Sequence, residues 1–348
     1  MKFNINSYFY FIIFSKILFG NVEFVSFGWE AFDYITDARS SALGNSNIAY
    51  KFDSPGSSII NPNFVNADQK FISLTHQSRF AGLINNDLIG FKFGRSNIPF
   101  NINVFYQSIG KIPDTREMLL DWGLDGQFGT NDTGEGNGIL DEGERLDKNK
   151  LSFFSQSQIG IHNSFKKSFF NQELGLAFKI LGKKLYKHSA LGVGIDLGIL
   201  KKYYGINFAV VVKNFPSSGL IWDDGKIEAT MTKLSIGSHY NKLYKNLPFN
   251  INLMSRFDFD SKLNEKNELF LEDIKESFGF EIVYEDKVYI RLGRDVYSNL
   301  TGGLGLLWDD FCIDYAFNNS FSSTGIGNNH LITFNLSIDF VINYVSKL

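Results

Sequence analysis

Alternation of apolar and polar side chains, with a period of two residues, dominates the C-terminal part of this chain. It recurs in three successive runs between residues 278 and 340. In the last run the apolar positions are Phe334, Leu336, Ile338 and Phe340. Successive side chains of a strand point to opposite faces, so each run predicts a strand with one apolar and one polar face. Short polar turns between the runs predict an antiparallel meander.

The same alternation extends back to Phe71 and predicts about 14 strands, separated alternately by short turns and by longer polar loops. Short turns at one end and long loops at the other are typical of an outer-membrane barrel. We therefore expect an all-β protein, a transmembrane antiparallel β-barrel over residues 71–340 with a C-terminal tail at 341–348. The expected long loops are 111–150, 215–228, 260–274, 296–301 and 319–327.

A large soluble β-sandwich is the alternative, because its strands alternate too. A sandwich has no need for aromatic residues at the ends of its strands, where a membrane barrel carries interfacial girdles. The chain has 36 Phe and 15 Tyr, and its mean hydropathy of −0.10 suits a barrel in which half of each strand is polar. The aromatic residues at expected strand ends are Phe249, Phe259, Trp308, Phe317 and Phe340.

Charge, cysteine content and motifs exclude several classes of protein. A net charge of −3 supplies no basic field for nucleic acid. Cys312 is the single cysteine, so no internal disulfide can form. The five histidines lack metal-ligand spacing, and no G-x-S-x-G, Walker or H-E-x-x-H motif occurs. We expect a protein that is not an enzyme and has no catalytic residues.

Residues 1–20 have the pattern of a secretory signal peptide. Lys2 precedes an apolar run at 8–19, and a cleavage site near Gly20 is expected. A membrane-anchor helix is the alternative, but Lys16 and the short run disfavour it. Export, together with the barrel, predicts a location in the bacterial outer membrane, with lipid as a partner.

Residues 21–70 do not alternate and are expected to form a short helical and extended segment that plugs the barrel lumen. Small residues follow Arg39, and Asn61 before Pro62 ends any helix. Arg39 is expected to be buried and to pair with lumen carboxylates or carbonyls. The inward row of the strands mixes both signs of charge, which favours a filled lumen over a water-filled pore. That row is Lys179, Asp196, Lys213, Arg256, Asp258, Glu281, Arg291, Asp314 and Asp339.

The expected extracellular loop at 111–150 is acidic and rich in glycine, which is the chemistry of calcium loops. Gly126 and Gly138 could each take the sixth position of an EF-hand-like loop, although neither register matches fully. We expect Ca²⁺ in a structural role; a solvated acidic loop is the alternative. The candidate ligands are Asp121, Asp125, Asp132, Asn137, Asp141 and Glu144.

Two stretches together resemble the PorV/PorQ family of outer-membrane barrels, within the FadL-like superfamily. The first is A-R-S-S-A-L-G-N-S-N-I-A followed by S-S-I-I-N-P, although Asn45 and Asn63 depart from the family pattern. The second comprises R-L-G, G-G-L-G-L, I-D-Y-A-F and N-H-L-I-T-F between residues 291 and 334. The plug motif of the first stretch consists of Arg39, Gly44, Asn61 and Pro62, with Ala49 also matching.

This resemblance implies a monomeric 14-stranded barrel with its N-terminal segment in the lumen. It also implies an accessory role in type IX secretion, in which secreted cargo proteins from a translocon are bound at the extracellular loops and passed to surface attachment. The alternative is a FadL-like channel for small hydrophobic solutes, which requires an apolar pocket and an opening past the plug. A purely structural barrel is a third hypothesis.

Overall fold

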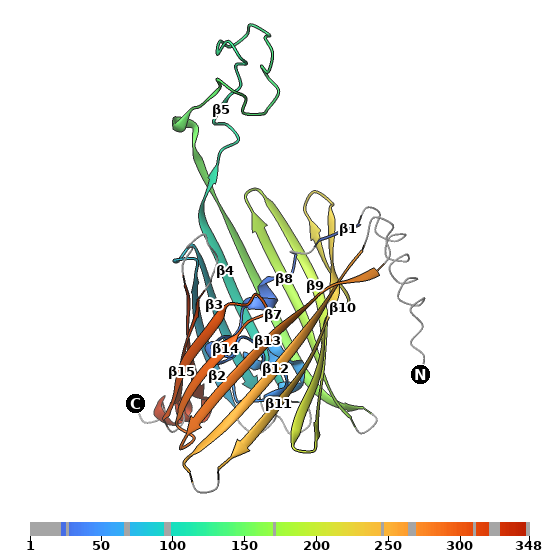
Figure 1. The fold of residues 1–348 in the computed structure, drawn as a ribbon, viewed down its shortest axis with the longest axis vertical. Helices are drawn as coiled ribbons and strands as arrows, with labels where there is room; N and C mark the ends of the chain where they lie inside the picture. The colour runs from blue at the N-terminus through green and yellow to red at the C-terminus, as the bar shows by residue number, and fades with distance from the viewer. Residues whose placement is uncertain are drawn as a thin grey trace.

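Fourteen antiparallel strands close into a barrel in the computed structural model (Figure 1). The structure describes residues 22–25, 28–65, 70–93, 99–169, 172–244, 247–263, 269–308, 311–319 and 328–345. The predicted signal peptide lies outside these residues. The barrel strands are β2 (Phe71–Arg79), β3 (Ile84–Phe93), β4 (Phe100–Asp114), β7 (Ser152–Phe169), β8 (Gln172–Leu185), β9 (His188–Tyr203), β10 (Ile206–Trp222), β11 (Ile227–Leu243), β12 (Phe249–Leu263), β13 (Leu269–Tyr284), β14 (Val288–Arg294), β15 (Leu300–Trp308), β16 (Phe311–Asn319) and β17 (Asn329–Ser337).

Closure of the barrel comes from the pairing of its last strand with its first. β17 pairs with β2 from Phe71–Ser337 to Ser78–His330, and every other barrel strand pairs with its neighbours in sequence. A closed ring of paired strands leaves no free strand edge where the wall crosses the membrane, which a lipid environment requires. The predicted fold class, a 14-stranded antiparallel barrel, is confirmed.

The two faces of the wall are the reverse of those of a soluble protein. Along β9, Gly192, Gly194 and Asp196 are buried, whereas Leu191 and Val193 are more than 60% exposed. Polar or small side chains thus face the lumen, and a belt of apolar ones faces outward. This pattern excludes the soluble sandwich. Within the described residues, no helix is both long enough and apolar enough to cross a membrane.

The two ends of the barrel differ in their connections. The hairpin of β4 and β7 projects far beyond the wall at one end and carries the acidic loop with β5 (Leu119–Leu120) and β6 (Arg145–Leu146) (Figure 1). We call this end outer and the opposite end inner.

Two of the predicted outer loops are mostly strand. β10 and β11 enclose only the turn 223–226, and β12 continues to Leu263. The sequence predicts loops here because P-S-S-G at 216–219 and the polar run at 260–262 interrupt the alternation, whereas backbone pairing extends into both stretches.

The C-terminal end differs from the prediction. β17 ends at Ser337, and α5 (Ile338–Val345) follows as a helix. Ile338, Val341, Ile342 and Val345 recur with helical spacing, which the preceding alternation masks. The exposed Asp339 therefore does not belong to the inward row, and the barrel ends before residue 340.

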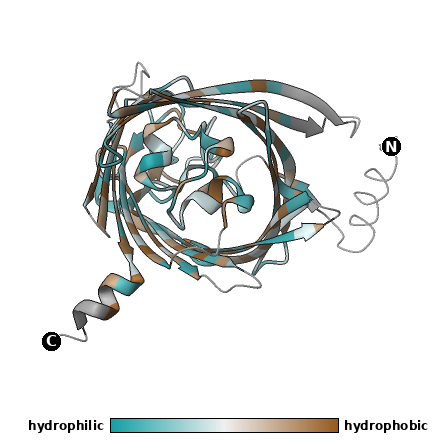
Figure 2. Cartoon of the chain, turned by 90° about the horizontal axis from the view of Figure 1, so that it is seen from below, coloured by the Kyte–Doolittle hydropathy of each residue, from teal (hydrophilic) through white to brown (hydrophobic). Residues whose placement is uncertain are grey.

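Residues 28–65, hereafter the plug, lie inside the ring of strands (Figure 2). Trp29, Phe32 and Ile59 pack against inward side chains of the wall, among them Leu88 and Phe105. Burial of these apolar groups is the main force that seats the plug. Its elements are α2 (Ala31–Tyr34), α3 (Ala38–Ala42), η1 (Asn47–Ala49), α4 (Ser57–Ile60) and η2 (Pro62–Phe64).

The segment before the plug belongs to the wall. β1 (Val22–Phe24) pairs in parallel with the outer end of β11, at Ile227–Ala229 (Figure 1). The expected lumen segment of residues 21–70 therefore starts with a short strand in the sheet.

Candidate functional site

Arg39 joins the plug to the wall through a buried cluster of alternating charges, hereafter the inner cluster. Its Nε and Nη2 donate to the two carboxylate oxygens of Glu281 at 3.0 and 2.9 Å. The fully buried Glu281 also accepts from Arg291 Nε at 2.7 Å and from the Tyr50 hydroxyl at 2.7 Å. Arg291 Nη1 donates to Asp314 at 2.6 Å. Two cations and two anions thus balance, and removing one of them would leave a buried charge unpaired.

Gly44, Asn61 and Pro62 set the course of the plug where it touches the wall. Gly44 has φ +63, and a Cβ there would lie 2.4 Å from the carbonyl oxygen of Arg294. Asn61 accepts from the backbone N–H of Asn63 at 2.9 Å and donates to the carbonyl of Ile48 at 2.8 Å. Pro62 opens η2. These three residues of the sequence motif therefore act in packing and local conformation, whereas Arg39 acts through its ion pair with Glu281.

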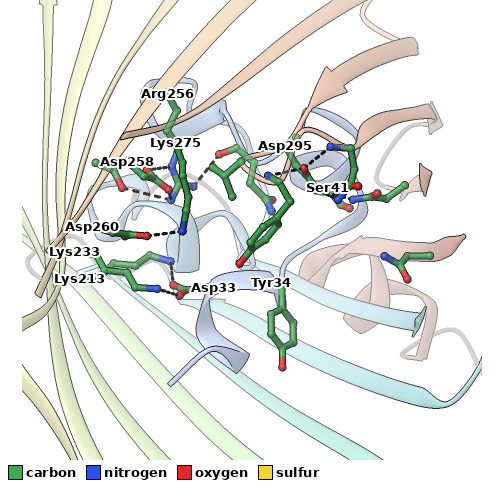
Figure 3. Close-up of a pocket in the computed structure, with 18 of the residues that line it drawn as sticks. Asp33, Tyr34, Ser41, Lys213, Lys233, Arg256, Asp258, Asp260, Lys275 and Asp295 are labelled. Carbon is green, nitrogen blue, oxygen red and sulfur yellow. Dashed lines mark hydrogen bonds and ion pairs between the residues drawn. The ribbon is translucent and has the colours of Figure 1, made fainter. Parts of the chain in front are cut away.

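A second group of charges, the outer cluster, holds α2 of the plug. Asp33 accepts from Lys233 Nζ at 2.6 Å and from Lys213 Nζ at 3.4 Å. Beside it on β12, Arg256 donates twice to Asp258, at 2.6 and 2.8 Å. These groups line an outer cavity of about 120 Å³, which Figure 3 shows between the plug and the wall. Its lining is mostly charged and polar, with Tyr34, Val296 and Tyr297 as the apolar or aromatic members, so it offers little apolar surface to a solute.

A third group of charges, on β8 and β9, touches the plug through aromatic rings. Lys179 Nζ lies 2.7 Å from Asp196 and donates to Asn214 at 2.6 Å. The same ammonium lies 5.3 Å from the ring of Trp29 and about the same distance from that of Phe32, which is cation–π geometry. Buried charges of the wall therefore contact the plug in three groups.

A larger cavity of about 520 Å³ opens on the inner side of the plug. At the end of this cavity that meets the plug, the Arg39 guanidinium is surrounded by three aromatic rings with centres 4.5–5.3 Å away, those of Tyr50, Phe52 and Tyr289. Asn241, Asn250 and Asp286 line its inner end. The cavity is a vestibule at the inner end, separated by the plug from the outer cavity.

The acidic loop uses its carboxylates to bind its own backbone. Asp121 accepts from Gly136 and Gly138 N–H at 2.7 and 2.6 Å, and these bonds hold its pKa below the usual value. Glu144 accepts from Gly123 and Asp141 N–H at 3.0 and 2.9 Å.

The other candidate ligands of the loop make similar bonds. Asp132 accepts from Asp125 N–H at 2.8 Å, and Asn137 donates to Asp141 at 2.7 Å. Among the described residues, which include all of this loop, no group of three or more His, Cys, Asp or Glu side chains could hold a metal ion. The arrangement as it stands does not fit a calcium site, and Ca²⁺ binding stays a prediction.

Several groups that hold the plug were not singled out from the sequence. Asp33 accepts from Lys233 in the outer cluster, and Tyr50 donates to Glu281 in the inner cluster. A signal existed for Asp33, because it is a lone carboxylate in the apolar run A-F-D-Y. His162 is fully buried with its Nε2 3.8 Å from Asp196, and nothing in its spacing predicted this.

No protein-family model matches the chain, and no curated protein matches it. Among solved structures, the CymD monoaromatic hydrocarbon channel is similar, with a TM-score of 0.50 and 9% identity over 87% of this chain and 97% of that one. The fold is that of an outer-membrane barrel. The TodX deltaS2S3 mutant, also a monoaromatic hydrocarbon channel, has a TM-score of 0.46 at 10% identity, covering 86% and 96% of the two chains. Omp33 of Acinetobacter baumannii has 0.38 at 7%, covering 78% and 98%.

The fold and the outward apolar belt together place the protein in the bacterial outer membrane. At these sequence identities the likeness concerns the fold alone.

Proposed function

We propose that the protein is a non-enzymatic docking barrel of the PorV/PorQ type, which assists type IX secretion or surface attachment by binding secreted proteins at its outer loops. The observation that carries the proposal is the occupied lumen. Charges of the plug are paired with charges of the wall at both ends, by Asp33 with Lys233 and by Arg39 with Glu281. A barrel closed in this way offers its outer surface to a partner.

The long β4–β7 hairpin supports the same proposal. Its ladder continues to Asp114–Ser152, and its loop carries exposed apolar side chains, with Phe128 81% and Ile139 64% exposed. Apolar groups on a projecting, hydrogen-bonded loop suit contact with another protein. We infer that secreted proteins bind at this loop.

The test replaces residues 119–146 by a short Gly-Ser turn in cells that produce the protein. We expect the barrel to assemble and the secreted proteins to be lost from the cell surface and to accumulate in the periplasm. Resistance of the barrel to unfolding in cold SDS is the control for assembly. Normal surface attachment in the loop-less strain, together with normal attachment in a strain lacking the whole protein, would contradict the proposal.

A channel for small hydrophobic solutes is the second candidate, favoured by the likeness in fold to CymD. It requires an apolar route through the lumen. The outer cavity is instead lined by Asp33, Lys213, Lys233 and other charged groups. Proteoliposomes containing the barrel should take up an aromatic hydrocarbon no faster than empty liposomes; faster uptake would favour the channel.

A further inference from the structure

The outer end of the wall parts between β11 and β12. The ladder between the two strands ends outward at the pair Lys233–Asp260. Farther out, β12 continues to Leu263 in pairing with β13. Residues Ile227–Ala229 of β11 pair there with β1. At the outer end, β1 thus pairs with the same edge of β11 that pairs with β12 nearer the inner end.

The β1 strand fits this place poorly. Of the residues described there, 22–25, three pair with β11, and one further bond joins Val25 N–H to the carbonyl of Ala229 at 2.9 Å. Glu23 lies directly opposite Glu228, so two carboxylates share one face of the pair. Like charges directly opposite each other destabilise strand pairing. A strand with a basic residue in place of Glu23 would turn this repulsion into attraction.

The place is accessible from the cell surface. Ile227 directly follows the exposed turn 223–226, and Glu23 is itself exposed. A strand edge presents main-chain N–H and C=O groups that accept any extended segment, and such strand addition is a common way of recognising peptides.

We propose that the seat of β1 on β11, at Ile227–Ala229, is a strand-docking site for an extended segment of another polypeptide chain that carries a basic side chain opposite Glu228. The incoming segment displaces β1 and takes over its main-chain hydrogen bonds. The main-chain hydrogen bonds supply the binding, and the basic side chain opposite Glu228 makes the site prefer such a segment to others.

Displacing β1 leaves the plug in place. After β1 the chain turns inward at Gly28, where a Cβ would lie 3.1 Å from Thr230 Oγ1, and Trp29 is 2% exposed. The Asp33 ion pairs follow within a few residues. Strand exchange therefore displaces β1 without breaking the contacts of Trp29 and Asp33, and the lumen stays closed. The site is independent of the proposed secretion role, because it concerns how a strand binds and not which protein supplies it.

The test uses two fluorescent peptides and a chain that begins at Val25, folded in nanodiscs. One peptide has the sequence of residues 21–27, and the other has Lys at the position of Glu23. Fluorescence anisotropy should show at least tenfold tighter binding of the lysine peptide, and Glu228→Lys in the same chain should reverse this preference. Methylating the main-chain nitrogens of the peptide should abolish binding. The full chain with Phe24→Cys and Ala229→Cys, in a Cys312→Ser background, should bind neither peptide when oxidised.

Three results would overturn the proposal. The first is no saturable binding of either peptide to the folded chain that begins at Val25, with folding shown by resistance to cold SDS. The second is binding that is unchanged by Glu228→Lys or by methylation. The third is entry of a hydrophobic dye through this chain without peptide binding, which would make the parted wall a route for solutes.

Discussion

At the scale of single residues, Glu281 is the group on which the inner cluster depends. It holds Arg39, Arg291 and Tyr50 at once and is fully buried. Glu281→Gln leaves two buried guanidinium groups short of one negative charge. We expect the free energy of unfolding to fall by about 3–5 kcal/mol, measured by urea titration of the refolded barrel in micelles.

Glu276→Gln on the same strand is the matched control. Its carboxylate pairs with Arg294 at 3.0 Å, but the two side chains are 50% and 42% exposed. We expect a change of less than about 1 kcal/mol, because solvent screens such pairs. Equal losses for Glu281→Gln and Glu276→Gln would mean that the buried cluster does not secure the plug.

The sequence predicted burial of Arg39 and a carboxylate partner, because a buried cation needs an anion. It placed Glu281 in the inward row but could not select it from the other lumen carboxylates, because Glu281 lies 242 residues away in sequence and meets Arg39 only once the barrel has closed. Gly44, Asn61 and Pro62 were likewise recognised by pattern, whereas the contact of Gly44 with Arg294 of the wall and the bonds of Asn61 within the plug are visible only in the structure.

At the scale of elements, the seating of η2 depends on the absence of a side chain at Gly175. A Cβ there would lie 2.2 Å from the backbone nitrogen of Asn63. Gly175→Ala must push η2 inward, and we expect a loss of about 1–3 kcal/mol in thermal or urea unfolding. Gly110→Ala in β4 is the control, because a Cβ there meets nothing within 4 Å. A neutral Gly175→Ala variant would show that η2 is not packed against β8.

The acidic loop should respond to pH through Asp121. Its pKa is lowered by N–H donors from Gly138 and Gly136, so the ionised form stabilises the folded loop. This contribution is complete above the ordinary pKa of about 4 and is lost as pH falls through the lowered pKa. Limited proteolysis at pH 7 should therefore cut the Asp121→Asn loop faster than the parent loop, with Glu142→Gln unchanged. Equal rates of cutting for all three loops would show that the Asp121 carboxylate does not stabilise the folded loop.

Calcium binding to the same loop is tested on the same gel. If the carboxylates rearrange around an ion, millimolar Ca²⁺ should slow cutting between residues 121 and 144, and a chelator should restore it. No effect of Ca²⁺ up to that concentration would contradict the predicted site.

Elements with a strict period of two could be predicted from the sequence, and elements whose surroundings change could not. The strands within the lipid belt were recognised because lipid and lumen force alternation on them. The outer parts of β10 and β12 were expected to be loops, because P-S-S-G at 216–219 and the polar run at 260–262 interrupt the alternation there. The first three residues of α5, 338–340, were expected to be strand because F-N-L-S-I-D-F alternates, and the rest of α5 was expected to be part of the C-terminal tail, although the residues from Ile338 onward also recur at helical spacing.

For the whole molecule, the account rests on a lumen closed by paired charges and apolar packing. The decisive measurement is single-channel conductance of the refolded barrel in planar bilayers, with and without residues 32–62. Deleting residues 121–144 from the outer loop is the control and should leave the conductance unchanged. We predict that the intact barrel is silent and that deletion of the plug residues opens a steady conductance. Steady conductance through the intact barrel would contradict the closed lumen and would favour a channel.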